Sequence, residues 1–394
     1  MAEVEVTIGP QHPALKEPVS FKVVVDGERI VRLDLNISYN HRGIEKAAEA
    51  RDFSKAMYLI ERICGICSHA HATNFAKGVE VLMGIEAPPR ARWIRLLVGE
   101  LERVHSHLLW LGVLAHEIGY NTLFMYSWRD REIVQDLLEA ISGNRVNYGM
   151  NRVGGVRRDI SDALRERIRE GLKALEERAL EYAQLITQEQ TLLVRTRGVG
   201  RLTTDQVIEL GSVGPVARGS GVSFDIRRDD PYLAYGEVPF DVITSKHGDV
   251  FGRAEVRALE IVQSVRMARH AVDNLPGGDI AVKAPRVAPK GEYVSRYEAP
   301  RGELLHYIRA NGSDKVERLA VRTPTLANWP SVVAAIQGSV LADVPVVVAA
   351  IDPCLSCTSR TTVVDVDAGT AKTLLWDDLV EYARRYYREK EGVG

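Results

Sequence analysis

The chain has 394 residues, of which 45% are hydrophobic and 26% charged, and its formal net charge at pH 7 is −2. This balance is typical of a soluble globular protein with a substantial core, and it provides no positive field that would attract nucleic acid or anionic lipid. The sequence has no apolar run of about 18 residues and starts without the basic and apolar regions of a signal peptide. We therefore expect a cytoplasmic protein that reaches a membrane only through a partner.

The N-terminal region is predicted to form a β-layer. Residues 19–37, VSFKVVVDGERIVRLDLNI, contain two alternating apolar runs on either side of Asp26 and Gly27. Such runs around an Asp-Gly turn are typical of a β-hairpin.

Helices are predicted after the β-layer, because apolar residues then recur three and four positions apart. The segment 93–120 keeps this spacing and also contains Glu100, Glu102 and Arg103, which favours a core helix over a membrane span. Further helices are predicted over 129–142, after the N-cap Ser161 through 193, after the capping-box pair Thr203 and Gln206, and over 254–275. Two long Gly/Pro/Asp-rich connections, 211–236 and 275–293, are expected to serve or cover a site.

The C-terminal region is predicted to contain a helix opened by Pro330 and then a buried strand, VPVVVAAI, over 344–351. That strand leads directly into DPCLSC. No repeat or composition break marks a linker. We therefore expect one α+β domain with an antiparallel β-layer over 1–50, a helix-rich bundle core over 51–275 and a C-terminal part over 276–360.

All four cysteines fall into two Cys-x-x-Cys pairs, Cys64/Cys67 and Cys354/Cys357, near opposite ends of the chain. In a reducing compartment such pairs indicate a metal site or a redox dithiol rather than a disulfide. Structural zinc modules keep their pairs roughly 15–20 residues apart, so a shared site here would join the two ends of a large domain. A four-thiolate metal centre is favoured, with zinc as the default metal, while two separate redox dithiols and chance stay open.

Each cysteine pair is followed by groups that can donate hydrogen bonds to sulfur. Such donors tune a redox-active metal more than an inert one, although a surface or capping role is the simpler explanation for any one of them. They are Ser68, His69 and His71 after the first pair and Thr358, Ser359 and Arg360 after the second.

The two cysteine motifs, RICGICSHAH (62–71) and DPCLSCTSR (352–360), closely resemble the signatures of the large, catalytic subunit of nickel–iron hydrogenases. Other stretches are similar to the group 4, membrane-bound, energy-converting branch, which is related to the quinone-site subunit of respiratory complex I. They include GPQHPALKEP, NHRGIEK, GNRVNYGMNRVGGV, EAPRGELLHY and RTPTLANW. The resemblance covers nearly the whole chain and implies a hydrogenase large-subunit-like fold.

The resemblance implies that all four thiolates bind nickel in an Ni-Fe(CN)2(CO) centre. Cys64 and Cys354 would be terminal ligands, while Cys67 and Cys357 would bridge to the iron. His71 matches a donor to a bridging sulfur. No cysteine remains for an iron–sulfur cluster in this chain.

Three further residues match functional positions of the family. Glu17, in ALKEP, matches the glutamate that passes protons to and from a nickel-bound thiolate, a task suited to a carboxyl of tuned pKa; a surface charge at a strand edge is the simpler alternative. Arg301, in APRG, matches the arginine over the open coordination position, and Asp352 matches its carboxylate partner. A salt bridge and Asp-Pro turn chemistry, respectively, are the alternatives for these two.

The chain also departs from its relatives. Glu45, in HRGIE, matches a buried carboxylate that binds magnesium in some of them, but Arg360 stands where many uptake hydrogenases have the histidine ligand of that metal. We therefore expect an arginine–carboxylate pair, and the case for Mg2+ is weak. Ser106 replaces an aspartate of the uptake enzymes. Complex I subunits lack the four cysteines and have a quinone-binding histidine near Lys16, so both differences argue against a quinone site.

Residues 361–394 form a C-terminal extension. In relatives with such a tail, a dedicated protease removes it after nickel insertion, which predicts cleavage between Arg360 and Thr361. The alternative is a retained tail that docks as an amphipathic surface helix.

The implied function is the reversible reaction 2H+ + 2e− ⇌ H2, mainly in the direction of H2 evolution. The implied partners are a small subunit with a [4Fe-4S] cluster, antiporter-like and complex I-like membrane subunits that translocate ions, a maturation protease and nickel chaperones, at the cytoplasmic face of the membrane. The ultimate electron source stays open among ferredoxin, formate and carbon monoxide dehydrogenase. Two rival functions are sulfane sulfur reduction at a related metal site and a non-catalytic structural role in a complex I-like assembly.

Overall fold

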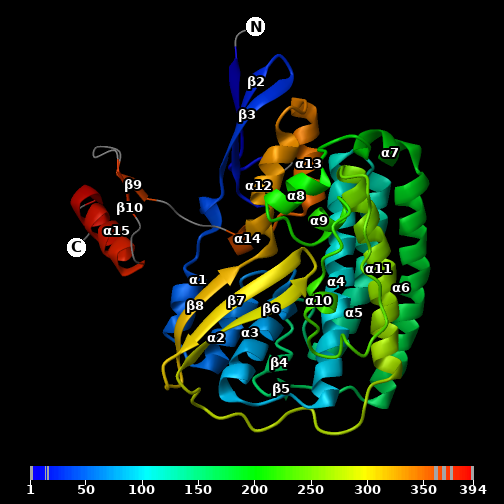
Figure 1. Cartoon of the computed structure of the whole chain (residues 1–394), viewed down its shortest axis with the longest axis vertical. Coiled ribbons are helices and arrows are strands. Elements are labelled where there is room, and N and C mark those ends of the chain that lie inside the picture. Colours follow the sequence, from blue (N-terminus) through cyan, green and yellow to red (C-terminus); the bar gives the residue numbers. More distant parts are fainter. Residues whose placement is uncertain are drawn as a thin grey trace.

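Long helices and two small antiparallel sheets make up the body of the protein (Figure 1). The computed structural model describes residues 3–13, 15, 17–358, 363–365, 370–372 and 376–391. The mixed, helix-rich α+β fold predicted from the sequence is confirmed.

The N-terminal sheet has the strand order β1-β2-β3 and contains the predicted hairpin. Its strands are β1 (Val4–Ile8), β2 (Ser20–Asp26) and β3 (Arg29–Asn36). Asp26 pairs with Arg29 across the turn, and Gly27 adopts a φ of 63°, which glycine reaches without strain.

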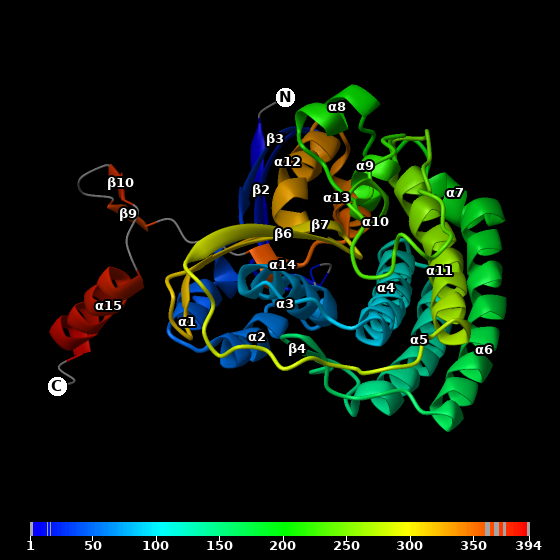
Figure 2. The same cartoon turned by 60° about the horizontal axis from the view of Figure 1, so that its bottom comes forward.

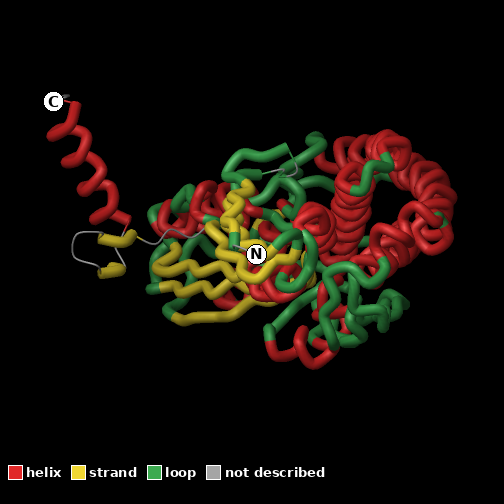
Figure 3. Tube along the Cα trace, turned by 90° about the horizontal axis from the view of Figure 1, so that it is seen from above, coloured by secondary structure: helices red, strands yellow, loops and turns green. Residues whose placement is uncertain are grey.

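Four long helices form a bundle beside the sheets, as the view from above shows (Figure 3). The helix α4 contacts α5 and α11, and α6 contacts the same two helices. Their bounds are Pro89–Glu117 for α4, Asn121–Ser142 for α5, Asp162–Gln188 for α6 and Val250–Asp273 for α11. The predicted N-cap Ser161 and the predicted capping box of Thr203 and Gln206 are both confirmed.

A second sheet, with the strand order β6-β7-β8, was not predicted from the sequence. It consists of β6 (Gly291–Ala299), β7 (Gly302–Ala310) and β8 (Val316–Arg322). The helix α3 (Ser68–Met83) packs against β6 and β7, and α1 (Ile44–Glu49) packs against β8 (Figure 2). This packing brings the segment after the first cysteine pair against a sheet from the C-terminal third of the chain.

The predicted strand over 344–351 is wrong, because this segment is the helix α13 (Val344–Ile351). A short apolar run that is buried on all sides carries no alternation to separate a strand from a helix, and Pro345 suits the first turn of a helix. The helix predicted to open at Pro330 instead begins earlier: α12 spans Pro324–Ile336, with Pro330 in its interior.

Shorter elements complete the described part of the chain. They are η1 (Ser38–Asn40), α2 (Phe53–Glu61), β4 (Asn151–Arg152), β5 (Gly155–Val156), α7 (Gln190–Thr196), α8 (Thr204–Glu209), α9 (Pro215–Arg218), α10 (Ile226–Asp229), η2 (Leu341–Asp343), α14 (Leu355–Thr358), β9 (Val363–Asp365), β10 (Thr370–Lys372) and α15 (Trp376–Glu391). The helix α15 stands apart from the body in Figures 1 and 2. Among the described helices, none combines the length and the apolar character needed to cross a bilayer.

Candidate metal centre

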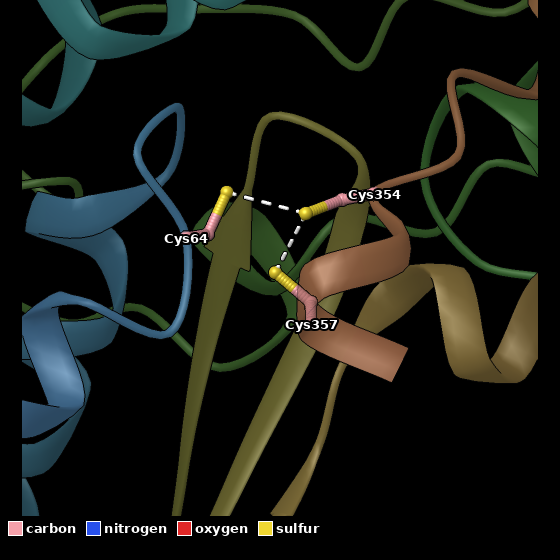
Figure 4. A group of neighbouring side chains, drawn as sticks. All are labelled: Cys64, Cys354 and Cys357. Atoms are coloured by element: carbon pink, nitrogen blue, oxygen red, sulfur yellow. Dashed lines mark hydrogen bonds between the residues drawn. The ribbon is translucent and has the colours of Figure 1, made fainter. Parts of the chain in front are cut away.

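The two cysteine pairs meet in the interior of the protein. The Sγ atom of Cys354 lies 3.3 Å from Sγ of Cys64 and 2.8 Å from Sγ of Cys357 (Figure 4). Cys64 extends from the loop before α3, whereas Cys354 and Cys357 lie at the start of α14 and within it. Cys67 belongs to an adjoining group with Cys357 and His71, in which the ligand atoms lie within 4.8 Å of one another. Cys357 is therefore common to two neighbouring groups of donors.

The chemistry of these donors fits a thiophilic metal centre. All four thiols are buried, and none is in a disulfide. Hydrogen bonds from the other three thiols, Cys354 first, hold the pKa of Cys64 well below its ordinary value. Burial and the neighbouring sulfurs raise the pKa of the Cys357 thiol. A metal cation would offset the charge of four crowded thiolates, which suits nickel, iron or zinc.

Backbone amides shape the first cysteine loop. The amides of Ile66 and Cys67 both point to Sγ of Cys64, at 3.2 and 3.4 Å. Cys67 then serves as the N-cap residue of α3, but its side chain makes no capping hydrogen bond. The sulfur of Cys67 is therefore available as a ligand of the metal centre.

Glu17 binds the start of the second cysteine motif. Its Oε2 accepts hydrogen bonds from the amides of Leu355 and Ser356, at 2.6 and 3.2 Å, and its Oε1 contacts the hydroxyl of Ser356. These residues lie between Cys354 and Cys357. The predicted surface charge at a strand edge is thus, in the fold, a half-buried carboxylate beside the sulfurs.

Arg301 and Asp352 form a buried pair next to the sulfurs. Arg301 lies in the two-residue turn between β6 and β7, where Gly302 has a φ of 125°. The turn touches the loop 211–236 at Gly214, where an added Cβ would lie only 2.3 Å from the carbonyl oxygen of Arg301. Two glycines therefore permit the backbone contact that holds the arginine in place.

Asp352 adopts the left-handed conformation, with a φ of 59°, at the end of α13. Arg257 donates hydrogen bonds to the carbonyls of Ala350 and Ile351, at 3.0 and 3.2 Å, so the last turn of the helix is held by a buried cation. This arrangement sets the path of the chain through Asp352 into Cys354.

Electrostatics keep Arg301 charged. Burial alone would lower its pKa, but Asp352 and the cysteine sulfurs raise it well above the ordinary value. Burial raises the pKa of Asp352 although Arg301 lowers it. The Oδ2 atom of Asp352 is buried and has no hydrogen-bond partner within the described part of the chain. One carboxylate oxygen is thus left without a partner at the wall of the site.

His71 contacts the shared sulfur, with Nε2 at 3.8 Å from Sγ of Cys357. Its Nδ1 lies 3.2 Å from Nε2 of His306, which comes from β7. Burial lowers the pKa of His71 to about 4, so the ring is neutral at physiological pH. Sequence reasoning missed His306; the available signal was a histidine on the same strand face as the buried Leu304 and Ile308.

A second missed residue, Arg42, joins the two cysteine loops. Its guanidinium donates to the carbonyls of Arg62 and Ile63, just before Cys64, and to the carbonyl of Ser356, at 3.1, 2.7 and 3.0 Å respectively. The sequence signal was its place in NHRGIEK, where only the glutamate was singled out.

The positions singled out beyond the sulfurs have different outcomes. Glu45 is only half-buried, and its Oε1 accepts a hydrogen bond from the amide of Val321 in β8 at 3.0 Å. Its expected partner Arg360 and the cleavage position before Thr361 lie outside the described residues. Ser106 is buried and accepts a hydrogen bond from Nη1 of Arg301 at 3.4 Å.

A cavity of about 320 Å3 opens onto this group of residues. Its polar wall is formed by Glu17, Cys64, Arg301, Asp352 and Cys354. Its apolar wall consists of Leu15, Val19, Leu109, Trp110, Val113, Trp128, Val348 and Ala349, among others. Glu17 also lines a separate hollow at the surface, formed by residues 10–13, 15, 17 and 18. The carboxylate thus borders both the interior site and the surface.

Two family models match the chain. The model described as nickel-dependent hydrogenase matches residues 42–165, and that of the respiratory-chain NADH dehydrogenase 49 Kd subunit matches residues 117–290 and 281–360. The chain belongs to the family of nickel–iron hydrogenase large subunits and their complex I relatives. The family resemblance inferred from the cysteine motifs is therefore confirmed.

Individual hydrogenase relatives match over most of their length. The membrane-bound hydrogenase subunit alpha of Pyrococcus furiosus is 43% identical over 92% of this chain and 88% of its own. The carbon monoxide-induced hydrogenase of Rhodospirillum rubrum is 38% identical over 91% of this chain and 100% of its own. In the solved structure of the membrane-bound sulfane sulfur reductase, an archaeal respiratory membrane complex, a matching chain has a TM-score of 0.87 and 31% identity, covering 91% of this chain and 98% of that chain. This hydrogenase family thus includes subunits of membrane-bound respiratory complexes.

Proposed function

We propose that this chain is the catalytic subunit of a membrane-associated nickel–iron hydrogenase that catalyses 2H+ + 2e− ⇌ H2, mainly towards H2. The observation that carries the proposal is the meeting of four buried thiols from opposite ends of the chain, beside a buried arginine. A purely structural subunit would have no need of four solvent-excluded soft ligands, two of which line a cavity.

Cys64, Cys67, Cys354 and Cys357 would hold the metals, and His71 would donate a hydrogen bond to Cys357. When bound, a nickel–iron centre would supply redox-active metals that pass electrons to protons and an open coordination position for the H2 reaction. The residues of the chain would position a charge and exclude water. Arg301, held by Asp352, keeps a fixed positive charge over the cavity, and the apolar wall excludes bulk water.

Glu17 is proposed to carry protons between the site and solvent. Its carboxylate contacts the α14 segment between two of the cysteines and lines both the cavity and the surface hollow. A carboxyl in this place can take a proton on one side and release it on the other by rotation about its side-chain bonds.

Sulfane sulfur reduction is a second candidate. Two observations favour it: the similarity to a chain of the sulfane sulfur reductase, and a cavity of about 320 Å3, which is far larger than H2 needs. The presence of all four cysteines favours the hydrogenase. Parallel assays of H2 evolution and of polysulfide reduction with the same purified complex separate the two.

The proposed partners follow from the lack of any further cysteine. Electrons would come from the iron–sulfur clusters of a small subunit, and complex I-like membrane subunits would couple the reaction to ion translocation at the cytoplasmic face. Cleavage between Arg360 and Thr361 by a maturation protease is part of the proposal; a mature subunit whose mass includes residues 361–394 would contradict it.

The deciding experiment is infrared spectroscopy on the complex purified under reducing, oxygen-free conditions, with metal analysis of the same sample. One metal-carbonyl band, two cyanide bands and one nickel per catalytic subunit are expected, with iron in excess of nickel because the iron–sulfur clusters of the small subunit add to it. Zinc or no metal in a tail-free subunit would refute the proposal and support a structural role.

A further inference from the structure

A helix begins at each cysteine pair, after Cys67 in the first and after Cys354 in the second, and its first amides bind a carboxylate from elsewhere in the chain. Glu17 does this for α14, as described above. At α3 the corresponding carboxylate is that of Glu102, from the middle of α4. Its Oε1 accepts from the amide of His69 at 2.6 Å, and its Oε2 accepts from the amide of Ala70 at 2.9 Å. The hydroxyl of Ser68 lies 3.4 Å from Oε1.

The reason for this arrangement lies in the capping of helices. The first amides of a helix have no partner within it, and an N-cap Ser, Thr, Asp or Asn normally supplies the acceptor. At α3 the N-cap residue is Cys67, whose sulfur belongs to the metal-binding group and makes no capping bond. The acceptor must then come from another element. Glu102 supplies it from the neighbouring helix α4.

Glu102 is fully buried, and residues at the start of α3 donate hydrogen bonds to its carboxylate. Burial raises its pKa to about 8, although the two amides lower it. A buried carboxyl is costly unless its hydrogen bonds are made. Its contacts therefore connect the central bundle helix directly to the first turn after Cys67.

We infer that Glu102 is a positioning residue of the metal centre, the buried counterpart of Glu17, which fixes the first turn of α3 and thereby Cys67 and His71. Without its oxygens, two buried amides would lose their acceptors, and the first turn of α3 would open more often. The effect should be confined to the first cysteine pair, because the second pair has its own carboxylate.

The test compares the alkylation rates of individual cysteines in the full-length, metal-free chain by mass spectrometry. Glu102→Met keeps the side-chain volume but removes both acceptors, and Glu102→Gln keeps one. We expect Glu102→Met to raise the rate at Cys67 relative to Cys354 roughly tenfold, with a smaller rise for Glu102→Gln. An unchanged ratio in both variants would overturn the inference.

The matched control is Asp249→Leu. Asp249 is also buried and accepts hydrogen bonds from two backbone amides, those of Gly198 and Gly252, but it caps α11. Its loss should destabilise the chain without changing the Cys67 to Cys354 ratio. The same change of ratio in this control as in Glu102→Met would show general loosening and overturn the inference.

A second readout uses the purified complex and rests on the proposed function, whereas the alkylation test does not. Glu102→Gln should shift the carbonyl and cyanide bands, and Asp249→Leu should leave them in place. Absent bands in the unaltered protein would refute the proposed function alone. Bands present but unshifted in Glu102→Gln, together with an unchanged alkylation ratio, would refute the role of Glu102.

Discussion

The side chain of Arg301 donates two hydrogen bonds to Asp352. Its Nη2 donates to the carboxylate oxygen Oδ1 at 2.8 Å, and its Nε donates to the backbone carbonyl of Asp352 at 2.7 Å. The arginine comes from a hairpin turn and the aspartate from the end of a helix, and both are buried. The two contacts fix the plane of the guanidinium as well as its position. Because Asp352 is followed by Pro353 and Cys354, the pair also ties the charge to a metal-binding cysteine.

Arg301→Lys should lower H2 evolution by roughly 100-fold. A lysine ammonium cannot make both of the hydrogen bonds that the planar guanidinium makes to Asp352, so its charge would lie elsewhere in the cavity. Metal content should stay normal, because Arg301 is not a ligand. The measurements are H2 evolution from a reduced dye, together with nickel and iron analysis. Activity within a factor of about two of the unaltered enzyme would contradict the role of the pair.

Glu17→Gln should lower the rate by at least about 100-fold, because the amide keeps the shape but does not transfer a proton at ordinary pH. The infrared bands and metal content should be retained, which separates proton transfer from assembly. Ser356→Ala, which removes one contact of the carboxylate, is the milder comparison. A loss of metal in Glu17→Gln would instead indicate a role in holding α14.

Arg42→Lys should weaken the retention of nickel against a chelator by roughly tenfold, because the carbonyls of Ile63 and Ser356 lose the fork that joins the two cysteine loops. Arg51→Lys is the matched control, since Arg51 also donates to a backbone carbonyl, that of Ala47, but on the surface of α1. Equal nickel loss in both variants would show that Arg42 has no specific role in holding the two cysteine loops together.

Arg257→Met should destabilise the chain by about 1–3 kcal/mol, because it leaves buried carbonyls of Ala350 and Ile351 without their donor. Trp110→Phe should act in the same direction, since Nε1 of Trp110 donates to the carbonyl of Ala349 at 2.7 Å. Denaturant unfolding measures both losses. Stabilities equal to that of the unaltered chain would show that the end of α13 is held by other contacts.

The metal-free chain should lose stability as the pH falls from about 6.5 towards 4. Burial lowers the pKa of His69 and His105 to about 3 and that of His71 and His107 to about 4. In this range the unfolded chain binds protons that the folded chain does not, so each histidine lowers the free energy of unfolding by about 1.4 kcal/mol per pH unit.

Urea unfolding over a pH series measures this slope. His107→Gln should reduce it, because the variant lacks the buried imidazole whose pKa is lowered. An identical slope in His107→Gln would show that this imidazole is protonated in the folded protein as readily as in the unfolded one.

The sequence predicted those features that local spacing encodes. Alternation predicted the hairpin around Asp26 and Gly27, and helical periodicity predicted the four bundle helices. The start of one of them was misplaced, because α5 begins at Asn121 and not at residue 129. The cap Ser161 and the capping box at Thr203 were recognisable because capping depends on residues three positions apart. Local pattern failed over 344–351, where a run buried on all sides has no periodicity to read.

Composition and spacing also determined the ligand type of the site, since all four cysteines occur as two pairs and soft thiolates select a thiophilic metal. Only the tertiary structure decided which residues support them. Glu102, His306 and Arg42 lie far in sequence from the groups they contact, and packing alone brings a helix, a sheet and two loops to one place. Burial then turns ordinary side chains into a positioning carboxylate and a neutral imidazole, because hydrogen bonds and charges count for more where water is excluded. Arg42 links the cysteine loops through its three backbone contacts, although its side chain is exposed.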